Sequence, residues 1–200
     1  MSVTGSLSSE RSFQANLAFG QQAETEVAKW LMRRGYSILP VYDIEYDTGK
    51  GPRLFSQGSQ IIAPDALVWR AGKCTWVECK RKTCFSWHRK SSSWVTGIDR
   101  CHWSHYQRIA AVTGIDVWIL FLHGSSCPDH RDVMHGCPDS CPSGLFGQSL
   151  AILEGCINHV HANYGKSGMV YWRHASLVLL SSLDVIMRVP RGTCGDYDTG

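Results

Sequence analysis

The chain has 200 residues, of which 44% are hydrophobic and 18% are charged, and its formal net charge is +3 at pH 7. That length fits one globular domain, or one domain with an insertion, and it is enough to bury a sizeable core. No apolar run reaches the roughly 18 residues that span a bilayer, so we expect a cytoplasmic protein without a membrane partner. Nine cysteines, in a chain whose start lacks the apolar core of a signal peptide, favour reduced thiols over a disulfide framework.

The N-terminal part predicts a tail, a helix and a strand. Residues 1–19 are polar, and we expect a flexible tail there. Apolar residues recur at helical spacing over residues 20–34, and Gly35 is a suitable residue to end that helix. Residues 36–46 alternate apolar and polar side chains, which is typical of a half-buried strand.

The next part predicts a hairpin, a second helix and a buried strand. Residues 60–69 and 74–82 form two strand-like segments joined by a tight turn. Residues 97–114 have helical periodicity, and residues 115–123 are strongly apolar. The resulting αβββαβ order over residues 20–123 predicts an α/β fold, with a mixed central sheet flanked by helices.

The composition changes after this predicted core. Residues 124–148 are rich in Cys, His, Pro and Gly and show little periodicity, so we expect an insertion there. Residues 149–190 are interpreted as C-terminal elements that pack on the core, and residues 191–200 as a disordered tail.

Two carboxylates and a lysine lie on the predicted hairpin. Asp65 follows Pro64 near the end of one strand, and Glu78 and Lys80 share one face of the other strand because they are two residues apart. A hairpin of this length can bring Asp65 close to Glu78. Two carboxylates held together repel each other, and a protein tolerates that where a divalent cation bridges them. Oxygen ligands of this kind suit Mg²⁺ or Mn²⁺.

The lysine extends this chemistry. Lys80 can approach the same point in space without being a ligand, and its ammonium can orient a water or stabilise charge that develops on a phosphate. Together the three residues predict metal-assisted hydrolysis of a phosphodiester. The alternative is that Glu78 and Lys80 form a surface pair and that Asp65 caps a turn.

The motif Pro64-Asp65 followed by Glu78-Cys79-Lys80 resembles the PD-(D/E)XK nuclease superfamily, whose core is restriction-endonuclease-like. The segment AETEVAKWLMRRGYSIL is similar to the opening of its Holliday-junction-resolvase-like branch. The resemblance implies a Mg²⁺- or Mn²⁺-dependent nuclease, an endonuclease or an exonuclease, with DNA as its substrate. Resolvases of this scaffold work as symmetric dimers, so a homodimer stays open, although no exposed apolar helix in the sequence demands one. No sequence-reading module is evident, so we expect selectivity for DNA structure rather than for sequence.

By the same resemblance, Asp65, Glu78, Lys80 and Glu24 are the catalytic residues, and the three carboxylates among them hold the metal. Glu24 lies in the first turn of the predicted helix, where the helix dipole also favours a glutamate without any metal. Glu26 is the competing carboxylate, but it lies about 200° around the helix from Glu24.

A basic stretch follows the hairpin directly. We expect DNA contacts from Arg81, Lys82, Trp87, Arg89 and Lys90. Lysine and arginine neutralise phosphates, and tryptophan stacks on unpaired bases. The alternative is a solvated loop whose tryptophans pack into the core. The resemblance adds Gln107, because several branches place a glutamine or a tyrosine on the following helix to assist DNA or metal binding. For both Gln107 and Tyr106, packing in the core is the alternative.

The Cys/His-rich segment suggests a second metal. Cys127, His130, Cys137 and Cys141 have zinc-ligand spacing, with His135 as a substitute, and we expect a structural zinc ion closed by four ligands. The alternative is an ordinary loop. Two other functions remain open: a non-catalytic, zinc-stabilised nucleic-acid-binding protein on the same scaffold, and a zinc-stabilised protein-interaction module.

Overall fold

The computed structural model describes residues 20–41, 53–56, 59–164 and 167–187. Its centre is a six-stranded mixed sheet in the order β1-β4-β5-β8-β9-β12. These strands are β1 (Ser37–Pro40), β4 (Ala66–Arg70), β5 (Lys73–Lys82), β8 (Val117–His123), β9 (Gly144–Ser149) and β12 (Val178–Ser181). The pair β5 and β8 is parallel, and the other neighbouring pairs are antiparallel. Helix α2 (Arg100–Thr113) lies in the crossover that a parallel pair requires.

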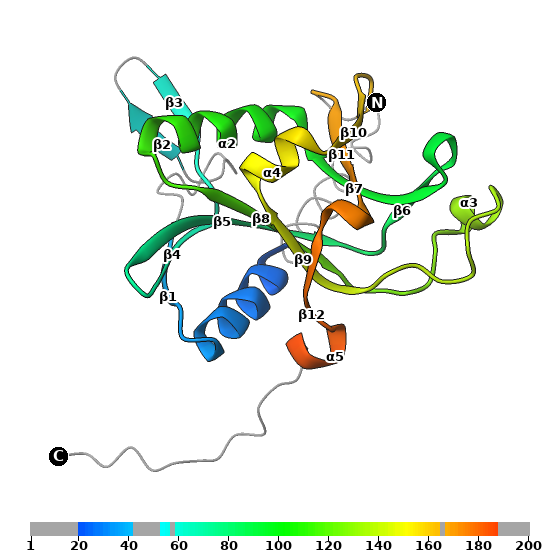
Figure 1. The fold of residues 1–200 in the computed structure, drawn as a ribbon, viewed down its shortest axis with the longest axis horizontal. Coiled ribbons are helices and arrows are strands. Elements are labelled where there is room, and N and C mark those ends of the chain that lie inside the picture. The colour runs from blue at the N-terminus through cyan, green and yellow to red at the C-terminus, as the bar shows by residue number, and fades with distance from the viewer. Residues whose placement is uncertain (1–19, 42–52, 57–58, 165–166, 188–200) are drawn as a thin grey trace, which may run out of the picture.

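Helices cover both faces of this sheet, as Figure 1 shows. The N-terminal helix (residues 20–33) buries Ala23, Val27, Trp30 and Leu31 against one face, together with Val68, Val77 and Leu120. Gly35 follows this helix with φ +80°, a left-handed conformation in which glycine is not strained. Helix α2 buries Trp103, Tyr106 and Ile109 against the other face, together with Trp76, Ile119 and Phe121.

A second, four-stranded antiparallel sheet packs beside α2, in the order β10-β11-β7-β6. Its strands are β6 (Ser86–His88), β7 (Ser93–Asp99), β10 (Ile157–His161) and β11 (Met169–Arg173). Trp172 is fully buried in the core that α2 also lines, and its Nε1 donates to the Leu153 carbonyl of α4 (Leu150–Gly155) at 2.9 Å. Gly97 allows the close approach of β11, because a Cβ there would lie 2.4 Å from the Val170 carbonyl oxygen.

Short elements complete the described chain. They are the hairpin β2 (Arg53–Ser56) and β3 (Ser59–Ile62), the 3-10 turns η1 (Arg89–Ser91) and η2 (His174–Ser176), and the helices α3 (His130–Val133) and α5 (Leu183–Ile186). None of the helices in the described residues is long and apolar enough to cross a membrane.

The predicted αβββαβ order is present as the N-terminal helix, β1, β4, β5, α2 and β8. Three expectations need correction. The basic stretch after the hairpin forms β6, η1 and β7 rather than a loop. The predicted insertion 124–148 ends too late, because its last five residues belong to the buried central strand β9. The segment expected to be helical after it is helical only in α4 and continues as β10. The predicted tails 1–19 and 191–200 lie outside the described residues.

Candidate active site

The candidate site lies where one edge of β5 is open. Strand β4 pairs with β5 only as far as Val77, whereas β8 pairs with β5 through Lys82. Within the described residues, positions 78–82 of β5 therefore have a strand on one side only. Asp65 lies just before β4, and its Oδ2 accepts a hydrogen bond from the Cys79 backbone N–H at 2.8 Å. This bond holds the Asp65 carboxylate beside the last part of β5.

Glu78 is the most buried carboxylate of the site, at 1% exposure. Its Oε1 forms an ion pair with Nζ of Lys80, and on α2 burial and the nearby Glu78 carboxylate raise the pKa of the Tyr106 hydroxyl. Burial alone lowers the pKa of Lys80, but Glu78 and Asp65 together raise it above its ordinary value. The lysine is therefore held as an ammonium at neutral pH.

The carboxylates act on one another. Burial raises the pKa of Asp65 well above its ordinary value, and the charge of Glu78 raises it further, while Lys80 partly opposes both effects. Burial also raises the pKa of Glu24, again with a contribution from Glu78. The site thus gathers three carboxylates around one ammonium, from the N-terminal helix and the hairpin.

A cavity of about 730 Å³ is lined by residues of both the N-terminal helix and the hairpin. Glu24, Asp65 and Cys79 line it among mainly apolar neighbours. Glu26, the competing carboxylate, instead pairs with Lys29 of its own helix at 3.2 Å. Glu24 is therefore the helix carboxylate that is placed toward the hairpin.

The donor chemistry of this site fits a hard divalent cation. All its candidate ligands are carboxylate oxygens, and their mutual repulsion is the kind that a cation relieves. The described residues hold no ready-made group of three or more His, Cys, Asp or Glu side chains with metal-binding spacing. Both hairpin carboxylates are engaged by the protein itself, Glu78 by Lys80 and Tyr106, and Asp65 by the Cys79 N–H.

Helix α2 contributes Tyr106, which the sequence indicated beside Gln107, and His102, which it did not single out as part of the site. Tyr106 contacts Glu78, whereas the predicted Gln107 donates to Glu154 of α4 at 2.8 Å. His102 lies one turn before Tyr106 with a ring centroid distance of 6.0 Å, and burial and the charge of Lys80 lower its pKa. For His102 the only sequence signal was its spacing of four residues from Tyr106, which places both side chains on one helix face.

The predicted DNA-binding residues divide into two groups. Arg81 and Lys82 end β5 beside the carboxylates, where burial and the charge of Lys80 lower the pKa of Lys82. Trp87, Arg89 and Lys90 lie on β6 and η1 of the second sheet. The Trp87 ring packs edge-on against Trp94 with a centroid distance of 5.1 Å, so it is partly buried rather than fully solvated.

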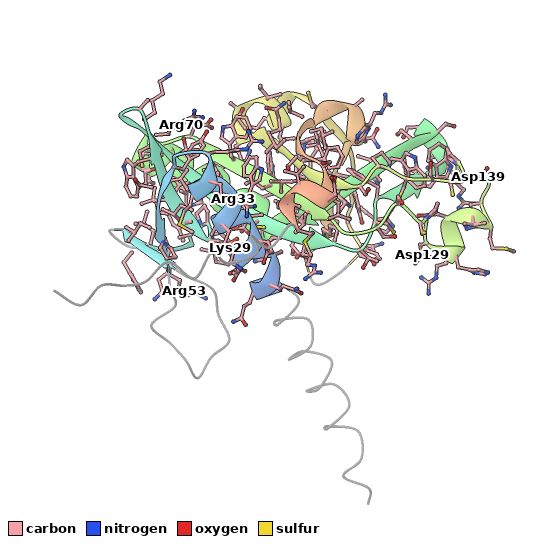
Figure 2. All side chains as sticks on the ribbon, turned by 90° about the horizontal axis from the view of Figure 1, so that it is seen from below. Lys29, Arg33, Arg53, Arg70, Asp129 and Asp139 are labelled. Atoms are coloured by element: carbon pink, nitrogen blue, oxygen red, sulfur yellow. The ribbon has the colours of Figure 1, made fainter. Side chains whose placement is uncertain are left out.

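The predicted zinc residues lie between β8 and β9, in a segment that projects at the opposite end of the molecule from Arg70, as the labelled Asp129 and Asp139 show in Figure 2. The buried Cys141 thiol donates a hydrogen bond to the Ser125 carbonyl at 3.4 Å, and it interacts electrostatically with Cys127 and with Cys84, which the sequence did not place in this set. His130 is exposed on α3. The structure therefore brings Cys84, Cys127 and Cys141 toward one another. They too are not arranged as a metal-binding group in the part of the chain that is described.

No protein-family model and no curated protein matches the chain. The solved structures that resemble it include the following two. One is a Holliday junction resolvase from the hyperthermophilic archaeon Archaeoglobus fulgidus, with a TM-score of 0.45 and 8% identity over 84% of this chain and 99% of the resolvase. The other is a nuclease from a fusselovirus, with a TM-score of 0.37 and 14% identity over 94% of this chain and 95% of the nuclease. Because both TM-scores lie below 0.5, the assignment of an activity rests on the residues of this chain.

Proposed function

We propose that the chain is a Mg²⁺- or Mn²⁺-dependent DNA nuclease that hydrolyses phosphodiester bonds, as an endonuclease or an exonuclease, and that selects DNA by structure rather than by sequence. The observation that carries this proposal is the gathering of Glu24, Asp65 and Glu78 around Lys80 at the open edge of β5. Like charges held close together, with Glu78 buried and Asp65 partly buried, cost folding free energy, and a chain that needed only a stable fold would gain by losing them.

Each residue of the site has a role in this proposal. Asp65, Glu78 and Glu24 would hold the cation, which supplies Lewis-acid stabilisation of the phosphate. Glu78 and Asp65 keep Lys80 protonated, so its ammonium can orient a water and stabilise charge that develops on the phosphate. The ion pair with Lys80 holds the Glu78 carboxylate, which the Tyr106 hydroxyl also faces, and the Cys79 N–H holds that of Asp65.

The surroundings of the site suit a polyanionic substrate. Arg81 and Lys82 follow the site on β5, where they can neutralise phosphates on either side of the reacting one. Most of the described chain beyond the core belongs to the second sheet and to short loops, with no helix after α2 longer than six residues. Reading of base edges in a major groove commonly uses a helix, and the two longer helices of the described chain both pack on the central sheet, so we expect recognition of backbone and shape.

The second candidate is a non-catalytic nucleic-acid-binding protein on the same scaffold, with a zinc-held segment. The carboxylates disfavour it, because they repel phosphates when no cation is bound. The zinc part has its own test, which is the zinc content of the purified protein. Cys84→Ser and Cys141→Ser should each lower that content if these thiols bind zinc, whereas Cys74→Ser on β5 serves as the control.

The test of the proposed nuclease is cleavage of labelled single-stranded, double-stranded, flap and four-way-junction DNA in Mg²⁺, Mn²⁺ or EDTA. We expect cation-dependent cutting that disappears in Glu78→Gln and Lys80→Met. Glu24→Gln and Glu26→Gln form a matched pair on one helix, and only Glu24→Gln should lower the rate and raise the cation concentration required. Binding without cutting on every substrate and cation, by folded protein, would move the assignment to the nucleic-acid-binding protein.

A further inference from the structure

The outer side of the second sheet carries a stack of three rings. His88 of β6 stacks on His159 of β10 with a centroid distance of 4.0 Å and an interplanar angle of 12°. His159 in turn stacks on Tyr171 of β11 at 4.6 Å and 7°. All three side chains are partly exposed, so the rings form part of the surface.

Strand alternation places this stack away from the core. Val170 and Trp172 of β11 are buried in the core shared with α2, so Tyr171 and Arg173 of the same strand point to the opposite side. Tyr171 lies over Gly97 of β7, where a Cβ would come within 2.7 Å of its ring. The glycine therefore leaves room for the Tyr171 ring to lie flat on the sheet.

Hydrogen bonds fix the first part of the stack. The Asn158 amide nitrogen lies 3.3 Å from Nδ1 of His88 and 2.9 Å from Nδ1 of His159. The Asn158 amide oxygen accepts a hydrogen bond from Nε of Arg173 at 2.9 Å. One asparagine thus holds two rings and a guanidinium in place, so little side-chain freedom remains to be lost when a ligand binds.

The charges around the stack are positive. Burial lowers the pKa of His88 most, and the charges of Lys90 and Arg173 lower it further. Burial also lowers the pKa of His159 most, and His88, His161 and Lys90 lower it further. A carboxylate, Asp99, acts on Tyr171, at the other end of the stack. The ring surface therefore favours an anionic ligand.

Further rings extend this surface along β10. The exposed His161 packs edge-on against Tyr164, which is 59% exposed, with a centroid distance of 5.9 Å. A row of flat rings bordered by cations suits a ligand that is itself a row of flat rings on an anionic backbone. Unpaired nucleotides have this chemistry, whereas a duplex hides its base faces and an acidic peptide lacks them.

We propose that His88, His159 and Tyr171, with Lys90 and Arg173, bind an unpaired segment of DNA, at a surface separate from the carboxylates of β5. This inference deepens the proposed function and rests on it, because a nuclease that selects DNA by structure needs a surface that distinguishes unpaired from paired strands. The stack supplies base stacking, and the two cations supply phosphate contacts.

The test is fluorescence anisotropy with a labelled single strand and with a duplex of the same sequence. The protein is the full chain with Glu78→Gln, in EDTA, so that binding is measured without cleavage. Removing a stacking ring by His159→Ala or Tyr171→Ala should weaken single-strand binding about 5- to 100-fold. Duplex binding should change less than about twofold, because paired bases do not reach the rings.

Matched controls separate the stack from general effects. Trp69→Ala removes a 37% exposed ring from β4, and Arg70→Ala removes an exposed cation from the same strand, which belongs to the central sheet rather than to the second sheet. Both should leave single-strand binding unchanged. Lys90→Glu changes an exposed residue of η1, so it tests the charge even if Tyr171→Ala fails to fold, and it should weaken single-strand binding at low salt.

The inference would be overturned if folded ring variants bound the single strand as tightly as their parent does. It would also be overturned if their affinities for the single strand and for the duplex fell equally. Displacement of the single strand by polyglutamate at equal charge concentration would also overturn it, since charge alone would then suffice. The proposed function fails separately. Suppose that the ring variants bind the single strand more weakly while the wild-type chain, which keeps Glu78, cleaves no substrate. That pair of results would support the binding surface and refute the proposed nuclease activity.

Discussion

Replacing Lys80 by methionine tests whether this lysine compensates the buried carboxylates. Lys80 pairs with Glu78 and opposes the effects of burial and of Glu78 on the pKa of Asp65 and of Glu24. Methionine keeps the apolar stem of the side chain and removes the ammonium. The variant therefore leaves three carboxylates facing one another, and we expect a marked loss of stability in metal-free protein.

The size of this loss follows from the burial of the pair. Removing one partner of a buried ion pair costs about 3–5 kcal/mol, because the other charge is left uncompensated. The side chain of Glu78 is 1% exposed but that of Lys80 is 29% exposed, so water screens one end of the pair. The lower limit, about 3 kcal/mol, then applies. For a domain of this size it corresponds to a decrease in Tm of roughly 6–12 °C.

The comparison with Glu78→Gln makes the test specific. That variant removes one of the repelling carboxylates and leaves Lys80 beside Asp65, so we expect a loss below about 1.5 kcal/mol. Both variants are measured by thermal unfolding at neutral pH in EDTA. Lys29→Met is the control, because it breaks the exposed pair with Glu26 and should cost less than about 1 kcal/mol.

Addition of Mg²⁺ provides the second readout. Lys80→Met keeps all three carboxylates without their ammonium, so the cation should raise its Tm by more than it raises that of the wild type. The reasoning would be refuted by a Lys80→Met variant that melts no lower than Glu78→Gln in EDTA.

Asp65→Asn should raise the Tm of metal-free protein at neutral pH, because burial and Glu78 raise the pKa of Asp65 and its ionised form opposes folding. The gain should vanish in unfolding curves taken below the pKa of an unfolded aspartate. The pKa shift of His123 has the opposite direction, because burial and Lys82 lower it to about 3. The free energy of unfolding should therefore fall as the pH falls from the pKa of an unfolded histidine toward 3, and His123→Phe should abolish this loss. Gly97→Ala should lower the free energy of unfolding by about 1–3 kcal/mol, seen as a lower urea midpoint, because the new Cβ would lie 2.4 Å from the Val170 carbonyl oxygen. Gly155→Ala is the control, because its new Cβ would meet nothing within 4 Å.

The sequence predicted the elements that carry their own local pattern. The N-terminal helix, the hairpin of β4 and β5, helix α2 and strand β8 each have a clear periodicity or an apolar run, and all are present. Strand parity alone placed Glu78 and Lys80 on one face, and they form an ion pair. The metal and DNA roles of these residues stay predictions.

The elements that the sequence missed depend on distant partners. Strand β7 pairs with β11, and β9 lies between β8 and β12, so their short, serine- and glycine-containing sequences become strands through partners far along the chain. The same holds for Cys84, which meets Cys141 only because the two segments fold together. Of the two candidates on α2, Tyr106 rather than Gln107 lies beside Glu78, because successive helical residues are about 100° apart.

Helix α2 links the two surfaces that we assign to DNA. Its Tyr106 contacts Glu78, and its Trp103 packs against Trp172 with a centroid distance of 5.0 Å, next in sequence to Tyr171 of the ring stack. Trp103 and Trp172 are both buried in one core, and close-packed cores resist relative movement of their elements. An unpaired strand held on the stack would therefore lie at a fixed distance from the carboxylates. We expect cuts at one or two positions relative to the unpaired segment, mapped on sequencing gels with end-labelled flap DNA. Cuts scattered along the duplex, with the ring stack intact, would contradict a rigid connection between the two surfaces.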